Sequence, residues 1–285
     1  MVSSRTQLAE AGATGSLGML LEVVAAGGAA ILSGAGLSTE SGIPDYRGPT
    51  GLARRATPMT YQTFTSSAAA RRRYWARSHV GWRRIASAAP NRGHHAVAEL
   101  GRRGLLAGII TQNVDGLHQA AGAAGVTELH GSLHRVICLD CGQRTSRTDL
   151  DRRLGAANPG WAVRSVLLNP DGDAVLDDAT AESFQVAACA SCGGVLKPDV
   201  VFFGENVPPA RARDCYTLVG QASALVVLGS SLAVMSGLRY VRHAAGLGLP
   251  VVIVNQGATR GDKYATATLD APLGDVLTAL VGLLR

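Results

Sequence analysis

Four short apolar runs, each followed by small or polar residues, stand out along the chain. They cover residues 29–33, 105–110, 225–228 and 251–254, and stretches with helical periodicity separate them. Runs of this length with few polar positions are typical of strands buried on both faces. Such strands occur in parallel sheets that helices cover on both sides. The pattern therefore predicts an α/β fold.

The stretches outside the runs define the remaining elements. Residues 1–16 are small and polar, so we expect a flexible tail there. Glycines follow the first two predicted helices, as is common at helix C-termini. Helices are predicted over 17–26, 92–103, 208–221 and 237–247, and from Asp275 onward.

The residues after the four runs are of the types that bind ligands in such folds. Ligands of open parallel sheets bind beyond the carboxyl ends of the strands, so all four groups would lie at one edge. Four such groups favour a dinucleotide site over a purely structural role. They are Gly34, Ala35 and Gly36; Gln112, Asn113 and Asp115; Gly229, Ser230 and Ser231; and Asn255, Gln256 and Gly257.

The first group is a glycine-rich turn between a strand and a predicted helix. Its backbone can approach a phosphate closely, and Ser38 and Thr39 are predicted to cap the helix. The standard dinucleotide fingerprint would have a third glycine at Thr39 and an acidic residue about 20 positions later. This chain departs from it at both points. Asp45, Tyr46 and Arg47 instead place an acid, an aromatic ring and a cation close to the turn.

Composition and charge narrow the class of protein. The 285 residues are 47% hydrophobic, enough for a large unit with a smaller companion, and no apolar run has the length of a membrane span. The net charge is +6, and arginines are dense between Arg47 and Arg103. A solvated helix face explains such a block, and attraction for phosphates, acidic acyl groups or nucleic acid is the functional alternative. We expect no nucleic-acid partner, because no known binding module accompanies the block.

Four of the five cysteines form two Cys-x-x-Cys pairs, Cys138 with Cys141 and Cys189 with Cys192. We expect no secretory signal, which disfavours disulfides and favours a metal. Four thiolates suit a closed tetrahedral Zn²⁺ site, and a closed site is structural rather than catalytic. Two redox dithiols are the alternative. Cys215, in a predicted helix, is interpreted as a core residue.

One histidine is a candidate general base. A short strand predicted at 126–129 leads to His130, and Gly131 leaves its surroundings open. An imidazole titrates near neutral pH and is suited to that task. Other histidines are interpreted as ordinary buried or surface groups, namely His94, His95, His118 and His134.

Two further stretches carry candidate substrate contacts. Pro198 marks a strand edge, since proline donates no backbone hydrogen bond, and a peptide could add as a strand to the extended residues that follow. Residues 49–90, rich in arginine and aromatic side chains, predict a helical flap over the ligand. The extended residues are Val201, Phe202, Phe203, Gly204 and Glu205.

The segments 34–38 (Gly-Ala-Gly-Leu-Ser) and 41–47 (Ser-Gly-Ile-Pro-Asp-Tyr-Arg) resemble the NAD-binding signature of the sirtuins. Nearly the whole chain after Leu17 is similar to that family in motif order, and its details look most like the class II, mitochondrial-type branch. The resemblance implies a Rossmann-like domain over 17–133 and 196–285 and a small zinc-binding module over 134–195. The implied cofactors are NAD and one structural Zn²⁺.

The resemblance also implies roles for the site residues. Asp115 would contact the nicotinamide amide, Asn113 would help to order the ribose, and His130 would be the general base. The glycine-rich turn would hold the pyrophosphate. The adenosine half would lie against Ser230, Asn255 and Leu273, and the acyl-lysine peptide would lie between 201–205 and the loop 231–236, which contains Leu232.

The implied reaction removes an acyl group from a protein lysine and consumes NAD. The acyl oxygen attacks the ribose C1′ as nicotinamide leaves, and no protein nucleophile is needed. His130 then removes a ribose hydroxyl proton, and that oxygen attacks the acyl carbon. The products would be nicotinamide, free lysine and O-acyl-ADP-ribose.

Several points stay open. Tyr74 and Arg77 have the spacing of a pair that grips acidic acyl groups in some sirtuins, and a solvated helix face is the other interpretation. Alternative functions are mono-ADP-ribosyl transfer or removal of lipoyl-type groups at the same site, nicotinamide-dependent oxidoreduction, and NAD or ADP-ribose sensing without turnover. We expect a monomer that acts on acylated protein lysines away from membranes, in the cytoplasm, or in mitochondria if the source is eukaryotic.

Overall fold

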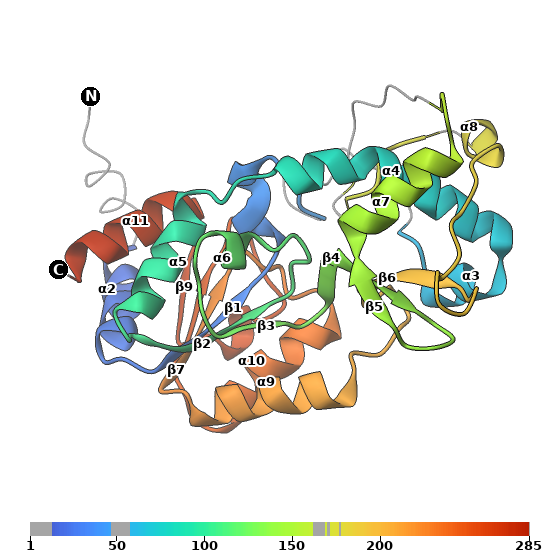
Figure 1. The fold of residues 1–285 in the computed structure, drawn as a ribbon. Coiled ribbons are helices and arrows are strands. Elements are labelled where there is room, and N and C mark those ends of the chain that lie inside the picture. The colour runs from blue at the N-terminus through green and yellow to red at the C-terminus, as the bar shows by residue number, and fades with distance from the viewer. Residues whose placement is uncertain (1–12, 47–57, 162–168, 170–171, 177, 285) are drawn as a thin grey trace, which may run out of the picture.

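The computed structural model describes residues 13–46, 58–161, 169, 172–176 and 178–284. A six-stranded parallel sheet forms the centre of its larger unit (Figure 1). The chain places β2 and β3 on one side of β1, and then β7, β8 and β9 on the other. A crevice forms where strand order reverses in this way, here at the carboxyl ends of β1 and β7. In sheet order the strands are β3 (Val126–Glu128), β2 (Leu106–Thr111), β1 (Ala29–Ser33), β7 (Ala224–Leu228), β8 (Val251–Val254) and β9 (Ala267–Leu269).

Alternate side chains of the strands enter two separate cores. In β1, Ala29 and Ile31 face one core, whereas Ala30 and Leu32 face the other. Helices on opposite faces of the sheet complete these cores, so the predicted α/β architecture is confirmed. The first core includes α2 (Ala13–Ala25), α5 (Arg92–Arg102) and α11 (Leu273–Leu283), and the second includes α9 (Pro209–Gln221) and α10 (Met235–Gly246).

The first helix and the last strand differ from expectation. The helix α2 begins at Ala13 and not at Leu17, so the end of the predicted tail is helical; residues 1–12 lie outside the described part. The three-residue strand β9 was not predicted, because so short a segment has no periodicity of its own. Cys215 lies fully buried in α9, as predicted.

A smaller unit is built on a second sheet. In it, β4 (Gly131–Cys138) pairs antiparallel with β5 (Arg144–Ser146) and with β6 (Leu196–Val200). Pro198 therefore lies on an edge strand, as predicted, although this strand belongs to the small sheet rather than to the large one. The helices α3 (Tyr61–Ser66), α4 (Ala68–Ser87), α7 (Arg147–Ala157) and α8 (Asp178–Glu182) complete the unit.

The predicted flap and the cysteine-bearing segment pack into one core. Trp75 of α4 lies in the same buried cluster as Leu150 of α7 and Cys138 of β4. Arg147, only 1% exposed, places its guanidinium carbon 5.5 Å and 5.0 Å from the ring centroids of Trp75 and Trp82. Cation–π contacts of this kind join α7 to α4. The described part of the flap is therefore an integral part of the small unit.

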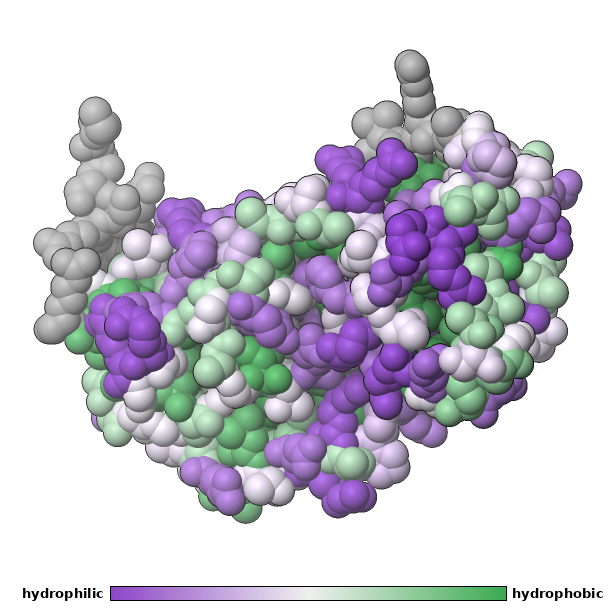
Figure 2. Space-filling model, viewed as in Figure 1, coloured by the Kyte–Doolittle hydropathy of each residue, from purple (hydrophilic) through white to green (hydrophobic). Residues whose placement is uncertain are grey.

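The two units lie side by side (Figure 1). On the face seen in Figure 2, hydrophilic side chains gather over the small unit and along its boundary with the sheet unit. The connections α6 (Leu117–Ala120), η1 (Ala35–Ser41) and η2 (Asp262–Tyr264) are short helical turns. Within the described residues, we find no helix with the length and apolarity to cross a membrane.

Candidate active site

A cavity of about 1390 Å³ lies between the carboxyl edge of the large sheet and the small unit. Cofactor and ligand pockets usually measure about 300–1000 Å³, so this one has room for a dinucleotide and part of a second ligand. The four predicted strand-end groups all contribute to its wall. Predicted residues in the lining are Gly34, Ala35, Gly36, Ser38, Thr39, Asp45, Tyr46, Tyr74, Gln112, Asn113, Asp115, His130, Val201, Phe202, Phe203, Gly204, Glu205, Gly229, Ser230, Ser231, Leu232, Asn255, Gln256, Gly257 and Leu273.

The glycine-rich turn meets the end of β7 at the switch point. The amide of Gly34 donates to the carbonyl of Leu228, and that of Gly36 to the carbonyl of Gly229, both at 2.9 Å. A Cβ atom at Gly34 would lie 2.7 Å from the Cβ of Ser230 and 2.8 Å from the carbonyl oxygen of Gly229. The glycine is therefore required for contact between two strand ends, whatever ligand binds beside it.

The prediction that Ser38 and Thr39 cap a helix is wrong. Both residues lie inside the 3₁₀-helix η1, whose N-cap, Gly34, makes no side-chain capping bond. The Thr39 hydroxyl donates to the carbonyl of Gly36 at 3.0 Å. The Ser38 hydroxyl is used by Asp115 instead. The Ser38 hydroxyl therefore bonds to the segment after β2 and the Thr39 hydroxyl bonds back to the start of η1, so neither accepts a hydrogen bond from the first amides of a helix.

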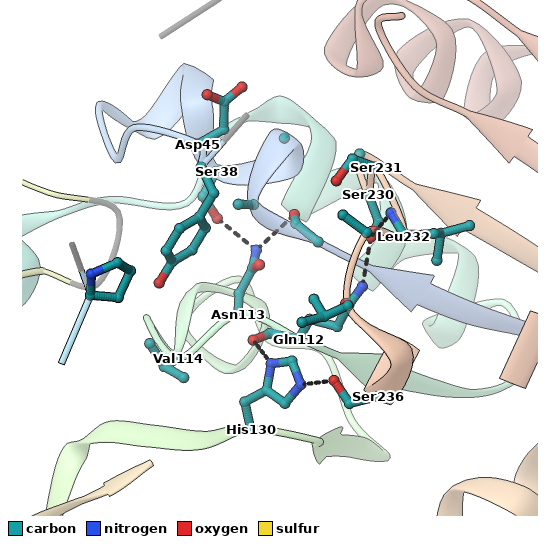
Figure 3. A pocket seen from close by; sticks show the side chains of 18 of the residues that line it. Ser38, Asp45, Gln112, Asn113, Val114, His130, Ser230, Ser231, Leu232 and Ser236 are labelled. Carbon is teal, nitrogen blue, oxygen red and sulfur yellow. Dashed lines mark hydrogen bonds between the residues drawn. The ribbon is translucent and has the colours of Figure 1, made fainter. Parts of the chain in front are cut away.

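A hydrogen-bonded group joins the ends of β1 and β2. The side-chain nitrogen of Asn113, Nδ2, donates to Ser38 Oγ and to the backbone carbonyl of Gly34, each at 3.0 Å (Figure 3). Ser38 donates in turn to Asp115 Oδ2 at 2.7 Å, and the Leu117 amide donates to Oδ1 at 2.9 Å. Burial raises the pKa of Asp115, while the bonds from Leu117 and Ser38 act in the opposite direction. The carboxyl group is thus fixed in orientation at the cavity wall.

The backbone around His130 is tightly constrained. Gly131 has a φ of +84°, and a Cβ there would overlap the carbonyl oxygen of Asp199. The carbonyl of His130 accepts from the Val201 amide at 2.8 Å. Gly131 therefore permits the close approach of β4 to β6, which differs from the expected role of leaving space around the histidine.

The His130 ring makes one hydrogen bond at each nitrogen (Figure 3). Nδ1 lies 3.0 Å from the carbonyl oxygen of Gln112. Since a carbonyl only accepts, Nδ1 carries the hydrogen and Nε2 of the neutral ring carries the lone pair. Burial lowers the pKa of His130 to about 4; the charges of Arg211 and Arg239 add to this, and the Gln112 carbonyl opposes it. The ring is neutral at pH 7, and its unprotonated Nε2 lies at the cavity.

Sequence reasoning missed the partner of that nitrogen. Ser236 Oγ lies 2.8 Å from His130 Nε2 and also lines the cavity. It stands in the first turn of α10, 106 positions from the histidine. The signal in the sequence was a hydroxyl shortly after a strand-end group, but nothing in the pattern connects it to a particular imidazole.

The segments after β7 and β8, with the start of α11, form a further part of the cavity wall. The Gln112 side-chain amide donates to Ser230 Oγ at 2.8 Å and ties β2 to β7. The Asn255 amide donates to the carbonyls of Gln256 and Gly257 at 3.0 and 2.8 Å, which folds the loop after β8 on itself. Leu273, at the start of α11, completes this part of the wall.

The segment after β6 forms another part of the cavity wall. The rings of Phe203 and Tyr46, each 37% exposed, meet edge to face with centroids 6.1 Å apart. The Tyr61 amide donates to the carbonyl of Phe203 at 2.9 Å, so α3 already occupies part of the edge expected to be free. Glu205 pairs with the buried Lys197 at 3.0 Å. Arg47, predicted beside Tyr46, lies outside the described residues.

The structure separates the two members of the predicted acyl-gripping pair. Tyr74 is 2% exposed and lines the cavity, with its ring packed against Phe202. Arg77 does not contribute to that lining. Its guanidinium donates to the carbonyl of Leu176 at 3.2 Å.

The four paired cysteines converge at the end of the small sheet. The Sγ atoms of Cys138 and Cys192 lie 3.5 Å apart, those of Cys141 and Cys189 lie 3.9 Å apart, and all four fall within 4.8 Å of one another. Four thiolates around Zn²⁺ at about 2.3 Å have sulfur–sulfur separations of about 3.8 Å. The donor set therefore fits a closed structural zinc site.

Three other histidines, His94, His118 and His134, hold parts of the framework together, whereas His95 is exposed. His134 Nε2 lies 2.9 Å from the backbone oxygen of Asp115, and His118 Nε2 lies 2.8 Å from Ser33 Oγ. His94 accepts from the Asn91 amide in a capping box at the start of α5. None of the three lines the cavity.

Comparison with known proteins agrees with this geometry. The Sir2 family profile matches residues 34–236. A relative from Streptomyces coelicolor, named NAD-dependent protein deacetylase 1, is 61% identical over 267 residues, which cover 94% of this chain and 89% of the relative. A protein of the same name from Mycobacterium avium is 49% identical, covering 92% of this chain and 93% of its own.

Solved structures give the same result. A Sir2 structure with a p53 peptide and NAD⁺ has a TM-score of 0.76 at 29% identity and covers 93% of this chain and 97% of its own. A Sir2 structure bound to an acetylated peptide has a TM-score of 0.74 at 28% identity, with coverages of 94% and 98%. The fold, the strand-end site and these likenesses together show that the chain belongs to the Sir2 family.

Proposed function

We propose that the protein is an NAD-dependent protein lysine deacylase that transfers the acyl group to ADP-ribose. The observation that carries the proposal is the His130 ring, whose Nδ1–H donates to Gln112 and whose unprotonated Nε2 lies in the same cavity as Asn113 and the Asp115 carboxyl group. The two relatives named NAD-dependent protein deacetylase support the same activity.

NAD is a co-substrate in this proposal, supplying a ribose carbon that accepts the acyl oxygen and a ribose hydroxyl that takes the acyl group. We assign the pyrophosphate to the turn 34–36 and the adenosine half to the wall formed by Ser230, Asn255 and Leu273. The nicotinamide amide is assigned to Asp115. Its carboxylate accepts two hydrogen bonds from the protein, which leaves acceptor sites for an amide N–H.

Asn113 and His130 then act on the ribose. The Asn113 side-chain nitrogen is held by Ser38 and Gly34. Among the described residues its amide oxygen has no hydrogen-bond donor, and it can accept from a ribose hydroxyl. His130 Nε2 takes the proton of a ribose hydroxyl, and the imidazolium that forms keeps its Nδ1–H bond to Gln112. General-base catalysis of this type accelerates a step by about 10²–10⁴-fold.

The acylated lysine is assigned to the wall formed by 201–205 and Leu232. Phe203 and Met235 are among the large apolar side chains that remain exposed there, at 37% and 44%. An apolar entrance suits the methylene chain of a lysine. Tyr74 stays in the proposal as part of the acyl pocket, whereas acid recognition by Arg77 would require that side chain to leave the Leu176 carbonyl.

A panel of acyl-lysine peptides incubated with NAD, with products identified by mass spectrometry, tests the proposal. We expect nicotinamide, free lysine and O-acyl-ADP-ribose in equal amounts. ADP-ribosylated protein without O-acyl-ADP-ribose would favour mono-ADP-ribosyl transfer, and preferential cleavage of lipoyl peptides would favour lipoamidase activity. Reduced nicotinamide would indicate an oxidoreductase. NAD binding without any product would leave the sensor function.

Three further assignments belong to this proposal. Zn²⁺ on the four cysteines would hold β4 and β6 together and take no part in the reaction. The class II branch is supported by the sequence features alone. A cytoplasmic location is supported by the bacterial relatives, and the monomeric state remains a prediction.

A further inference from the structure

We propose that Ser236 is a positioning residue for the general base, with a hydroxyl that supports the His130 ring both before and after the ring takes up a proton. The inference deepens the proposed function and rests on it, because it takes His130 as the base. No strand-end group contains this serine. The resemblance included it as the last residue of the substrate loop 231–236 and implied no contact between its hydroxyl and His130.

The geometry around the ring supports this role. One hydrogen bond, from Nδ1 to Gln112, leaves the ring free to tilt about that contact. The second contact, between Ser236 Oγ and Nε2 at 2.8 Å, lies on the opposite side of the ring and fixes its plane (Figure 3). Ser236 itself is anchored in the first turn of α10, where the backbone is regular.

The surroundings leave Ser236 as the partner of Nε2. Within the described part of the chain, it makes the one hydrogen bond found at that nitrogen. The charged groups that influence the ring are Arg211 on α9 and Arg239 on α10. Both are cations, so neither can accept the hydrogen that Nε2 gains.

A hydroxyl suits both states of the base. In the neutral ring, the Ser236 O–H donates to the Nε2 lone pair. During catalysis the ribose hydroxyl takes that place; its O–H bond breaks, the electron pair stays on the ribose oxygen that attacks the acyl carbon, and an N–H bond forms at Nε2. The Ser236 hydroxyl then rotates its hydrogen away and accepts from Nε2–H. An alkyl side chain can do neither, and a carboxylate could serve the protonated ring alone.

The ratio of two measured rates tests this role. Exchange of labelled nicotinamide into NAD, in the presence of an acetyl-lysine peptide, measures reversal of the half-reaction that precedes the base. Release of free lysine measures the half-reaction that needs it. We expect Ser236→Ala to slow lysine release by about three- to tenfold, the effect of one net hydrogen bond. Exchange should stay within twofold, so the ratio of exchange to release rises.

Two matched variants complete the design. Ser236→Thr keeps the hydroxyl and should restore the wild-type ratio. Ser223→Ala removes an exposed hydroxyl that donates to the carbonyl of Gly27 and should leave the ratio unchanged. If wild type and Ser236→Ala turn over with the same ratio, the positioning role is overturned and the proposed function stands. If the wild type releases no nicotinamide with any acyl peptide, the proposed function fails, and this inference fails with it.

Discussion

The Ser38 hydroxyl donates to the Asp115 carboxylate across 2.7 Å, although 77 positions separate the two residues. The serine follows β1 and the aspartate follows β2, and the parallel pairing of these strands brings both to one edge of the sheet. The bond orients the carboxyl group. It also lowers the pKa of Asp115, which burial raises, and so favours the charged form. The chemistry of the cavity therefore depends on the register between two strands.

Asp115→Asn tests the assigned role of this carboxylate. In the variant, one carboxylate oxygen is replaced by an NH₂ group, which cannot accept a hydrogen bond. Either the Ser38 hydroxyl or the Leu117 backbone amide, which both donate to Asp115, would therefore lose its acceptor. We expect kcat/KM for NAD to fall by about ten- to hundredfold, as for loss of a hydrogen bond to a charged group. Asp149→Asn, at an exposed site on α7, is the control. An unchanged kcat/KM in Asp115→Asn would contradict the assignment.

Gly34→Ala tests the contact at the switch point. The added Cβ would lie 2.7 Å from Ser230 Cβ, so the ends of β1 and β7 must move apart. We expect a loss of about 1–3 kcal/mol in the free energy of unfolding, as for overpacking, with weaker NAD binding. Gly18→Ala, in α2 with no atom within 4 Å of the new Cβ, should be neutral or stabilising. Equal stability of the two variants in urea unfolding would argue against the contact.

Cys141→Ser tests the metal assignment. Metal analysis of the wild type should find one zinc per chain, and the variant should lose it, since a serine hydroxyl is a poor replacement for a thiolate. The small sheet should then melt at lower temperature, because the β4 and β6 ends are no longer joined. Cys215 lies in α9 and is not part of the four-cysteine cluster, so Cys215→Ser should retain the zinc. Full zinc content in Cys141→Ser would refute a four-cysteine site.

His94→Gln addresses the pH dependence of stability. Burial lowers the pKa of His94 to about 3, and the nearby His118 and His95 add to the effect. Because histidine in the unfolded chain titrates near 6.5, the unfolded state binds more protons over this range, and the free energy of unfolding falls as the pH falls below about 6.5. Glutamine can still accept from the Asn91 amide in the capping box.

We therefore expect His94→Gln to flatten the decline in the free energy of unfolding between pH 6 and 4.5. The change in slope should reach up to about 1.4 kcal/mol per pH unit, the value for one proton. Urea unfolding at several pH values measures this slope. Any change in stability that comes from protonation of the cysteines at low pH is the same in both proteins. Parallel lines for the two proteins would show that His94 takes up its proton in the folded state.

The sequence was most informative where local pattern and tertiary role coincide. The strands β1, β7 and β8 are apolar because both faces are covered, so their runs could be found directly. Their polar followers could be placed at one edge because parallel strands share a direction. The two Cys-x-x-Cys pairs could be recognised from their spacing alone. The metal cluster and most of the cavity lining could therefore be anticipated.

Other features depend on contacts that no local pattern reports. The hydroxyl of Ser38 faces Asp115 rather than a helix end, because η1 begins directly after the strand. Ser236 meets His130 through the packing of α10 against the sheet. Arg77 turns toward Leu176 because α4 packs into the small unit. Each outcome was decided by how distant elements meet.

Turnover by His130→Ala, measured beside its affinity for NAD, tests the central claim most directly. We predict that the variant loses at least about a hundredfold in lysine deacylation, as expected for loss of a general base, while the Kd for NAD stays within a few-fold of the wild type. A variant that deacylates acyl-lysine peptides at the wild-type rate would contradict the account.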